Sequence, residues 1–537
     1  MRLIRIAARQ SDLARLQAYE VGKRLLKTAS DRKIALQVQY SFRSSLGDQR
    51  ADDPLWKMPE KGVFTEDFVH DLQTGAVDLV VHSWKDLPIQ EREGTLIAAT
   101  LERADARDLL LVRREAWREH QDAFRRGEGL KTFRVLTSSP RRGYCLKPLF
   151  EWLLPWSQIS NLDSRPIVEF VPVRGNIATR VEKIQTADAL VVAKAALDRL
   201  LTAGVHADVD DKLAASAEAL RAKLSRLDFV VLPLSLNPTA AAQGALAIEV
   251  RKSDAELLKL CAWIDSSKDR EDVEEERRVL ASYGGGCHQK IGVTRLRRNG
   301  GSFTFLRGLT DAGVVLSSQG YSRDGETATS EALLRGKNVW RSEGLVATRT
   351  KVQELDLKFV QAAREKSQGV LRLFVARAEA WRGECLGSRD VVWTAGLATW
   401  RRLTEQGVWV HGSSEGLGEV EEARLEALLG HPVQTLRLTH AESALGSSES
   451  GAALGTYQVR YSVEAPDLLD GRDAYLWKSK GQIAGVLEAK PEVFKPRRAL
   501  HAVGPGKTLE NIRLVLSNAG WSAEDLEAGL LVLLDET

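Results

Sequence analysis

The stretch Val80-Val-His-Ser-Trp-Lys-Asp-Leu-Pro88 decides the fold, because a short buried strand in it ends in a charged pair. Open α/β sheets bind their ligands at the carboxyl edge of the strands. A carboxylate at that edge can stabilise a developing cation and move protons. Lys85 and Asp86 are therefore candidate functional residues. For this pair taken alone, the alternative is a satisfied ion pair at a strand end.

The sequence on both sides of this stretch predicts an α/β protein. Short apolar runs alternate with longer amphipathic stretches, and the runs include Leu3 to Ala7, Val77 to His82 and Ala189 to Ala193. This alternation indicates largely parallel sheets covered by helices. A helix is expected from about Ser11, which is suited to cap its N-terminus.

The length of 537 residues suggests about three or four domains. We expect a first lobe over 1–105, completed by about 212–237, and a second lobe over 106–211. A small α/β domain is expected over 238–325. A further α/β unit is expected over 338–537, with strand-like runs at Leu373 to Ala376, Val391 to Thr394, Tyr475 to Ser479 and Ala499 to Val503.

Composition excludes several classes of function. The 76 Lys and Arg nearly cancel 73 Asp and Glu, so the charge of +3 gives no global attraction to nucleic acid or an anionic membrane. No stretch approaches the roughly 18 apolar residues of a membrane span, and the first residues do not resemble a signal peptide. The four cysteines have no metal-ligand spacing. We expect a cytoplasmic monomer without a metal.

The segment Tyr283-Gly-Gly-Gly-Cys-His-Gln-Lys-Ile-Gly292 carries a lone thiol among glycines. Glycines let the backbone approach a ligand closely. A thiolate at Cys287 could attack a carbon electrophile and leave a stable thioether. The alternative is a buried free cysteine in a glycine turn.

Arginines recur in segments that also carry turn and helix-cap residues, namely at Arg9, Arg141, Arg142, Arg174 and Arg180. Guanidinium groups bind carboxylates bidentately, and helix N-termini add further donors. As a set they predict a cleft for a polycarboxylate, although any single pair is more often a solvated face. A two-lobed protein that binds a carboxylate without catalysis would also have such a cleft. It would need neither Cys287 nor the Lys85–Asp86 pair.

Seven segments, in this order, resemble the motifs of the porphobilinogen deaminases. They are Arg5-Ile-Ala-Ala-Arg-Gln-Ser11, Lys61-Gly-Val-Phe64, Val81-His-Ser-Trp-Lys-Asp-Leu-Pro88, Thr137-Ser-Ser-Pro-Arg-Arg142, Arg174-Gly-Asn-Ile-Ala-Thr-Arg180, Gln243-Gly-Ala-Leu-Ala-Ile-Glu249 and Gly284-Gly-Gly-Cys287. The resemblance implies three domains, with a cleft between two lobes that are similar to those of periplasmic binding proteins. It also implies that four porphobilinogen molecules are joined into hydroxymethylbilane with loss of ammonia.

The same resemblance assigns roles to residues. Cys287 would carry a dipyrromethane cofactor through a thioether, and Asp86 would handle positive charge and protons on pyrrole nitrogens. A loop near Phe64 would move. The residues expected to bind cofactor, substrate and growing chain are Arg9, Ser11, Gln17, Lys85, Thr137, Ser138, Ser139, Arg141, Arg142, Arg174, Gly175, Arg180, Gln243 and Gly244.

The sequence departs from the family pattern at four positions, each occupied by an unusual residue: Trp84 for Met, Pro140 for Leu, Ala242 for Gly and Lys290 for Pro. None of these changes removes a charged or nucleophilic group. We expect them to alter the shape of the cleft or the rate rather than the chemistry.

The C-terminal unit resembles the uroporphyrinogen-III synthases, through Val503-Gly-Pro-Gly-Lys-Thr508 and, more loosely, Val410-His-Gly-Ser-Ser-Glu-Gly-Leu-Gly418. A P-loop is not expected, because His501 stands where that motif needs glycine. The resemblance implies ring closure of the linear tetrapyrrole. The candidate residues for this second site are Thr394, Ser479, Gly504 and Thr508. The alternative is an inactive structural unit.

Overall fold

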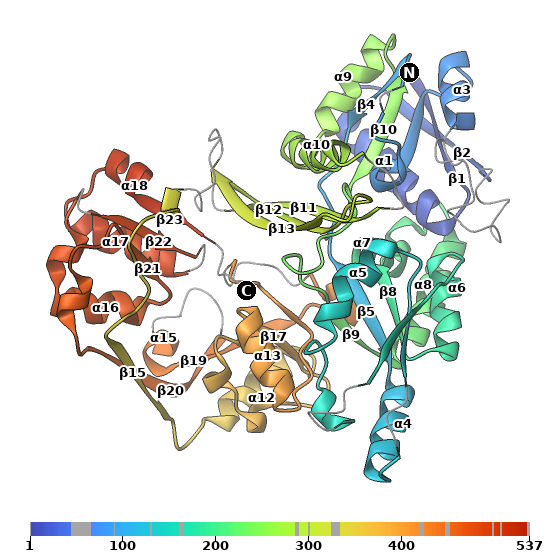
Figure 1. Cartoon of the computed structure of the whole chain (residues 1–537). Helices are drawn as coiled ribbons and strands as arrows, with labels where there is room; N and C mark the ends of the chain where they lie inside the picture. Colours follow the sequence, from blue (N-terminus) through green and yellow to red (C-terminus); the bar gives the residue numbers. More distant parts are fainter. Residues whose placement is uncertain are drawn as a thin grey trace.

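The fold is given by a computed structural model (Figure 1). It describes residues 2–44, 66–90, 92–128, 132–160, 166–284, 289–298, 301–323, 333–417, 424–445, 452–496, 499–504 and 507–533. Phe64 and Cys287 therefore lie outside the described residues. Every helix in the described ranges is too short or too polar to cross a membrane.

The first lobe is built on a five-stranded sheet with the order β2-β1-β3-β10-β4. Its strands are β1 (Arg2–Arg9), β2 (Leu36–Arg43), β3 (Leu79–Ser83), β4 (Thr95–Ala99) and β10 (Leu246–Arg251). Its helices are α1 (Asp12–Asp31), α3 (Glu66–Thr74) and α9 (Ala255–Ile264). Ser11 caps α1 by accepting from the Ala14 N–H at 3.4 Å, as its position before the apolar periodicity predicts.

The second lobe has a sheet with the order β7-β6-β8-β5-β9. Its strands are β5 (Asp108–Arg113), β6 (Phe133–Leu136), β7 (Val168–Val171), β8 (Ala189–Ala193) and β9 (Leu227–Val231). Its helices are α4 (Arg114–Arg125), α5 (Pro140–Leu149), α6 (Ile177–Lys183), α7 (Lys194–Leu201) and α8 (Asp211–Leu224). Two segments, 100–107 and 232–245, join the lobes, and we call them the crossover segments.

Two predictions about the domains are wrong, and both concern the sheet that a strand joins. Strand β9 pairs antiparallel with β5 of the second lobe, so 212–237 does not complete the first lobe. Strand β10, which was expected in the small domain, instead pairs with β3 and β4 of the first lobe. Both sheets are consequently mixed rather than largely parallel. Apolar runs of five or six residues look alike in sequence, so they do not reveal which sheet they join.

The small domain consists of α10 (Ser267–Ser282) and an antiparallel sheet of β11 (Lys290–Arg298), β12 (Gly301–Leu309) and β13 (Val315–Arg323). Buried Phe303, Phe305 and Tyr321 belong to the same apolar cluster as residues of the C-terminal unit, among them Trp340 and Trp477. The small domain therefore packs against the C-terminal unit as well as following the first lobe.

The C-terminal unit holds two sheets rather than one. The four-stranded parallel sheet contains β14 (Val339–Trp340), β21 (Ala474–Trp477), β22 (Leu500–Val503) and β23 (Leu530–Val532), with helices α16 (Lys480–Ala489), α17 (Lys507–Asn518) and α18 (Ala523–Gly529). The six-stranded sheet has the order β15-β20-β19-β16-β17-β18. Its strands are β15 (Leu345–Lys351), β16 (Leu371–Val375), β17 (Val391–Thr394), β18 (Gly412–Ser413), β19 (Gln434–His440) and β20 (Ala452–Val463).

Helices α12 (Leu357–Lys366), α13 (Leu397–Glu405), α14 (Glu426–Leu429) and α15 (Ala441–Leu445) accompany the six-stranded sheet. The antiparallel pair β15 and β20 lies between the two parts of the unit in chain order and forms one edge of that sheet. In Figure 1 the red part with β21 to β23 lies at the left, and the orange part lies beside the second lobe.

The six-stranded sheet meets the second lobe edge to edge. The Val231 N–H at the end of β9 donates to the His411 carbonyl oxygen at 2.7 Å. The Trp409 indole N–H donates to the Phe229 carbonyl oxygen at 3.2 Å. An edge strand exposes unpaired backbone groups, and here the C-terminal unit covers them.

The same contact buries aromatic side chains from both sides. Trp400 on α13 is fully buried, and its indole N–H donates to the Leu153 carbonyl oxygen at 3.2 Å. Leu153, Trp156 and Trp400 belong to one continuous apolar cluster that spans the second lobe and the C-terminal unit. The two units therefore share a hydrophobic core.

We expect Trp400→Ala to lower the free energy of unfolding by about 3–5 kcal/mol, because it leaves a cavity in the shared core. Urea unfolding of the whole chain measures this. The matched control is Leu514→Ala, since Leu514 is 60% exposed on α17. A loss no larger than that of the control would contradict the shared core.

Candidate active site

The charged pair predicted from sequence lies on a short 3₁₀ turn, Trp84–Asp86, directly after β3. Buried Trp84 anchors this turn in a small apolar cluster with Ala242 and Val273. Lys85 extends toward the second crossover segment and donates to Gln243 Oε1 at 3.2 Å. Asp86 is exposed. The turn thus holds Lys85 inward while Asp86 stays accessible.

The start of α1 contributes to the same edge of the first sheet. Arg9 ends β1, and Ser11 caps α1. Gln17 is buried, and its side-chain N–H donates to Ser83 Oγ at 2.9 Å, at the end of β3. The structure therefore brings these three residues to the strand ends that also carry Lys85 and Asp86.

In the second lobe, the predicted residues cluster where β6 ends and α5 begins. Thr137 Oγ1 accepts from the Ser139 N–H at 3.3 Å, and Ser139 caps α5 by accepting from the Arg142 N–H at 3.4 Å. Ser138 Oγ accepts from the Val173 N–H at 2.9 Å, which joins this turn to the segment before Arg174. Local side-chain bonds therefore shape the turn.

The turn before α6 gathers positive charge. Gly175 has a φ of +110°, and a Cβ there would lie 2.8 Å from Thr179 Cγ2, so another residue would be strained. The Arg180 Nε–H donates to the Gly175 carbonyl oxygen at 2.8 Å. Burial, and then Arg142 and Arg174, lower the pKa of Arg180 despite the opposing effect of Asp86. An anion bound here would relieve that crowding of like charges.

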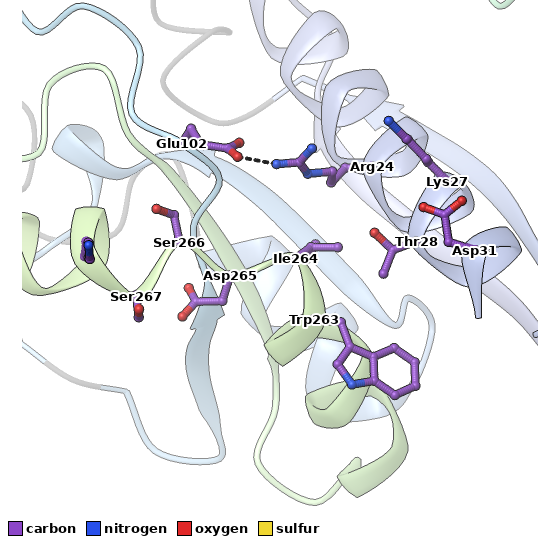
Figure 2. Close-up of a pocket in the computed structure, with 11 residues that line it drawn as sticks. Arg24, Lys27, Thr28, Asp31, Glu102, Trp263, Ile264, Asp265, Ser266 and Ser267 are labelled. Carbon is purple, nitrogen blue, oxygen red and sulfur yellow. Dashed lines mark hydrogen bonds and ion pairs between the residues drawn. The ribbon is translucent and has the colours of Figure 1, made fainter.

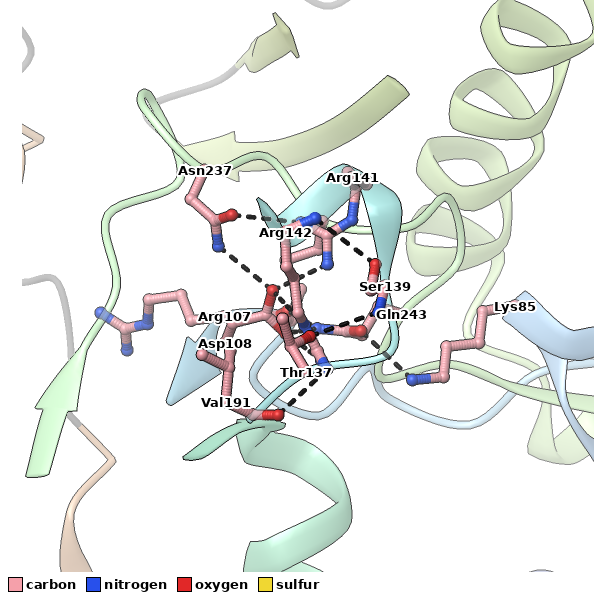
Figure 3. Close-up of polar contacts among 12 residues, drawn as sticks. Lys85, Arg107, Asp108, Thr137, Ser139, Arg141, Arg142, Val191, Asn237 and Gln243 are labelled. Atoms are coloured by element: carbon pink, nitrogen blue, oxygen red, sulfur yellow. Dashed lines mark hydrogen bonds and ion pairs between the residues drawn. The ribbon is translucent and has the colours of Figure 1, made fainter. Parts of the chain in front are cut away.

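A buried carboxylate, Asp108 at the start of β5, joins several predicted residues (Figure 3). It accepts from Arg142 Nη2 at 2.6 Å and from Arg141 Nη2 at 2.8 Å. It also accepts from Gln243 Nε2 at 2.9 Å and Asn237 Nδ2 at 3.1 Å. Burial favours the neutral acid, but the two guanidinium groups hold the pKa of Asp108 well below its usual range.

The two arginines of the Thr137–Arg142 motif thus have internal partners. Arg141 also donates to the Pro238 carbonyl oxygen at 2.7 Å, and Arg142 to the Val191 carbonyl oxygen at 3.2 Å. Both side chains are buried. Their first structural role is to neutralise Asp108 and to tie α5 to the second crossover segment. Binding of a ligand carboxylate by either one stays a prediction.

Gln243 and Gly244 lie in the second crossover segment. The Gln243 side chain bridges Asp108 and Lys85, so it links the network of the second lobe to the turn of the first. Gly244 has a φ of +90°, and a Cβ there would lie 2.6 Å from the Ala104 carbonyl oxygen of the other crossover segment. Glycine lets the two crossover segments pass in close contact.

Sequence reasoning missed Asp108 and Asn237. Asp108 opens the apolar run Asp108-Leu-Leu-Leu-Val112, and a carboxylate at the head of a buried strand was the available signal. Asn237 carries no such signal, because an Asn before Pro reads as an ordinary turn. Both residues act by hydrogen bonding to side chains that are far away in the sequence, so local sequence does not reveal their role.

Phe64 and Cys287 cannot be placed, since both fall outside the described residues. The segment around Cys287 is flanked by described residues, and Gln289 Nε2 donates to the Tyr283 carbonyl oxygen at 2.6 Å. The roles of Phe64 and Cys287 stay predictions.

The candidate residues of the C-terminal unit fall on both of its sheets. Thr394 ends β17 in the six-stranded sheet and is fully buried. Ser479, Gly504 and Thr508 follow the neighbouring parallel strands β21 and β22. Ser479 caps α16 and makes a hydrogen bond of 3.0 Å with the Tyr461 hydroxyl. These three therefore gather at the carboxyl edge of one sheet, whereas Thr394 belongs to the other.

A cavity of about 560 Å³ lies away from the predicted residues, between the last turns of α1 and the junction of α9 with α10 (Figure 2). Its lining includes Arg24, Lys27, Trp263 and Lys268. Arg24 forms an ion pair with Glu102 across it. Its lining is mixed in charge, with Asp31 and Asp265 beside the cations.

Comparison with known proteins relates the chain to one family. Residues 4–259 match the family model described as porphobilinogen deaminase, dipyromethane cofactor binding domain. A probable porphobilinogen deaminase of Methanopyrus kandleri is 33% identical over 327 residues, which are 60% of this chain and 93% of the relative. The porphobilinogen deaminase of Syntrophomonas wolfei is 30% identical over 344 residues, 64% of this chain and 95% of the relative. That of Synechococcus elongatus is 32% identical over 341 residues, 62% of this chain and 89% of the relative.

We expect Asp108→Asn to destabilise the chain by about 3–5 kcal/mol, because it leaves two buried guanidinium groups without a counter-charge. A carboxylate with a lowered pKa stabilises the fold above its ordinary pKa and loses that contribution as the pH falls. Between about pH 4 and pH 2, the unfolding free energy of the variant should therefore fall less steeply than that of the wild type.

The control is Asp122→Asn, whose parent side chain is 56% exposed on α4. It should change the unfolding free energy by about 0.5 kcal/mol or less. Equal pH slopes for the wild type and Asp108→Asn would contradict the assignment.

Proposed function

Because the chain belongs to the porphobilinogen deaminase family, we propose that it joins four porphobilinogen molecules into hydroxymethylbilane with release of ammonia. The observation that carries the proposal is the joining of Lys85, Gln243, Asp108, Arg141 and Arg142 across the two lobes. Lys85, Gln243 and the Arg141–Arg142 pair come from three separate motifs of that family, and Asp108 joins Gln243 to both arginines. Tetrapyrrole biosynthesis is the corresponding metabolic role.

The positive charge of the candidate site suits the substrate. Each pyrrole brings two carboxylates, so a growing chain needs several fixed cations. Burial lowers the pKa of Lys85, with Asp86 opposing and Arg142 reinforcing that shift. Arg180 is shifted in the same direction by burial, Arg142 and Arg174. Carboxylates bound beside these groups would restore both pKa values toward their ordinary range.

Dipyrromethane is the cofactor that the matched family model names. We propose that Cys287 holds it through a thioether and that the cations of the cleft bind its carboxylates. When bound, this group supplies the fixed pyrrole end to which substrate is added. The cofactor carries carboxylates like those of the substrate, so the same positive residues would bind both.

Asp86 is the proposed catalytic residue. Its carboxylate is exposed beside Lys85 and close enough to Arg180 to influence the pKa of that residue. As ammonia leaves porphobilinogen, positive charge develops on the pyrrole, and a fixed carboxylate would stabilise it and accept a proton from pyrrole nitrogen. Arg9, Ser11 and Gln17 would orient the substrate at the same edge.

We propose a second activity for the C-terminal unit, ring closure of the linear product to uroporphyrinogen III. Ser479 at the N-terminus of α16 and its partner Tyr461 support it, because a helix N-terminus and hydroxyls suit a carboxylate ligand. The alternatives are a deaminase with a structural C-terminal unit and a two-lobed carboxylate binder. The cytoplasm is the proposed compartment, since Cys145, Cys261 and Cys385 are free thiols.

We expect Cys287→Ser to abolish the consumption of porphobilinogen and to remove the added mass of a dipyrromethane from the intact chain. Asp86→Asn should keep that mass and lower kcat by roughly 10²- to 10⁴-fold, because it removes a charge and a proton acceptor. Intact-mass spectrometry and a porphobilinogen assay measure both effects. A Cys287→Ser chain that keeps the mass and turns over substrate would sink the deaminase assignment.

We expect wild-type chain incubated with porphobilinogen to yield uroporphyrin isomer III after oxidation, as separated by chromatography. Isomer I is the product of closure without ring inversion. Isomer I alone would leave the deaminase intact and reduce the C-terminal unit to a structural role. No consumption of porphobilinogen by cofactor-loaded protein would favour the carboxylate binder.

A further inference from the structure

The C-terminal unit touches both crossover segments of the two-lobed part. The Arg424 guanidinium donates to the Arg103 carbonyl oxygen at 3.3 Å in the first crossover segment. The guanidinium carbon of Arg107, in the same segment, lies 5.6 Å from the centre of the Trp393 ring. Glu415 contacts the second crossover segment. The unit therefore contacts both of the segments that connect the two lobes.

Glu415 makes the most specific of these contacts. It lies just after β18, and its φ of +52° is unusual for a residue that is not glycine. Its two carboxylate oxygens accept from the Leu234 N–H at 2.8 Å, the Ser235 N–H at 2.8 Å and the Ser235 hydroxyl at 2.6 Å. Because the carboxylate binds two successive backbone N–H groups, it fixes both the position and the direction of the crossover segment.

Leu234 and Ser235, which Glu415 binds, belong to the same short segment as Asn237 and Gln243 of the candidate site. Asn237 follows Ser235 by two positions and donates to Asp108. Gln243 lies eight positions beyond Ser235 and is 1% exposed, and its side chain holds both Asp108 and Lys85. Glu415 therefore holds one end of a short segment whose other end contacts Lys85, the residue beside Asp86.

The electrostatics agree with this geometry. Burial raises the pKa of Glu415, and its bonds to Ser235 and Leu234 and the charge of Arg107 act in the opposite direction. A partly buried carboxylate is costly unless its oxygens are satisfied by donors. The crossover segment supplies three hydrogen-bond donors to the Glu415 carboxylate. These donors offset the cost of burying its charge.

We propose that Glu415 is a positioning residue for the deaminase reaction: the C-terminal unit uses it to hold the second crossover segment, and with it Gln243 and Lys85, in register with Asp86. The inference rests on the proposed deaminase function. It gives the C-terminal unit a role in the first reaction that does not depend on any activity of its own. A displacement of catalytic groups by about 1 Å costs large factors in rate, so loss of the grip should appear in kcat.

The test compares full-length Glu415→Gln with the wild type, each loaded with cofactor. The amide keeps the size of the side chain but presents an NH₂ group to donors. We expect kcat for porphobilinogen consumption to fall roughly five- to tenfold, with KM changed by about twofold or less. Amide hydrogen exchange in 232–245 should accelerate by about tenfold or more.

The control is Glu488→Gln, an exposed residue on α16 that lies outside this contact. It should leave all three quantities unchanged. Ser235→Ala removes one of the three donors with little risk to folding, and it should lower kcat in the same direction by about twofold. It keeps the test decisive if Glu415→Gln does not fold.

Unchanged kcat and unchanged exchange in 232–245 for folded Glu415→Gln and Ser235→Ala would overturn the inference. A lower unfolding temperature with unaltered kcat and KM would overturn it too, since that is the result of a purely structural contact. A wild type that consumes no porphobilinogen would defeat the proposed function and the kinetic claim together. Faster amide hydrogen exchange in 232–245 of the variants would then still show that Glu415 holds this segment in place.

Discussion

The structure depends on a buried carboxylate, Asp108, which stands between two guanidinium groups. Removing these three charges from water is costly, and the cost is offset only while all of them face one another with good geometry. Their partners come from β5, α5 and the second crossover segment, so the charges stabilise the fold only when the three are assembled. The network therefore fixes where the crossover segment runs, and the crossover segment places Gln243 against Lys85 of the first lobe.

A second constraint is the exposed edge of β9. A sheet edge invites pairing with other chains, and natural proteins cover or shorten such edges. Here the segment after Trp409 covers it through the bond between Val231 and His411. The aromatic residues around Trp400 then exclude water from the same boundary. This explains why the C-terminal unit is joined to the second lobe through a core rather than through a loose linker.

Local signals were enough for several elements of the fold and for part of the site. The strands ending at Ser83 and Ala193 and the cap at Ser11 follow from periodicity and cap chemistry, which act over a few residues. The chain position of Lys85 and Asp86 after a buried strand predicted their place at a sheet edge. The sheet that β9 joins could not be read in this way, because strand partners are set by tertiary packing.

The partners of Arg141 and Arg142 show what a motif alone leaves out. Sequence presents them as cations for a ligand, since their guanidinium groups are well suited to carboxylates. The structure gives them an internal carboxylate, and only the three-dimensional position of Asp108 reveals it. Arg141 and Arg142 neutralise Asp108 and so stabilise the fold. At Arg180, by contrast, burial and the neighbouring arginines lower the pKa, so a bound anion would be stabilised there. To tell these two kinds of arginine apart, one must know their partners. The main partner, Asp108, lies in a segment that the motifs do not contain.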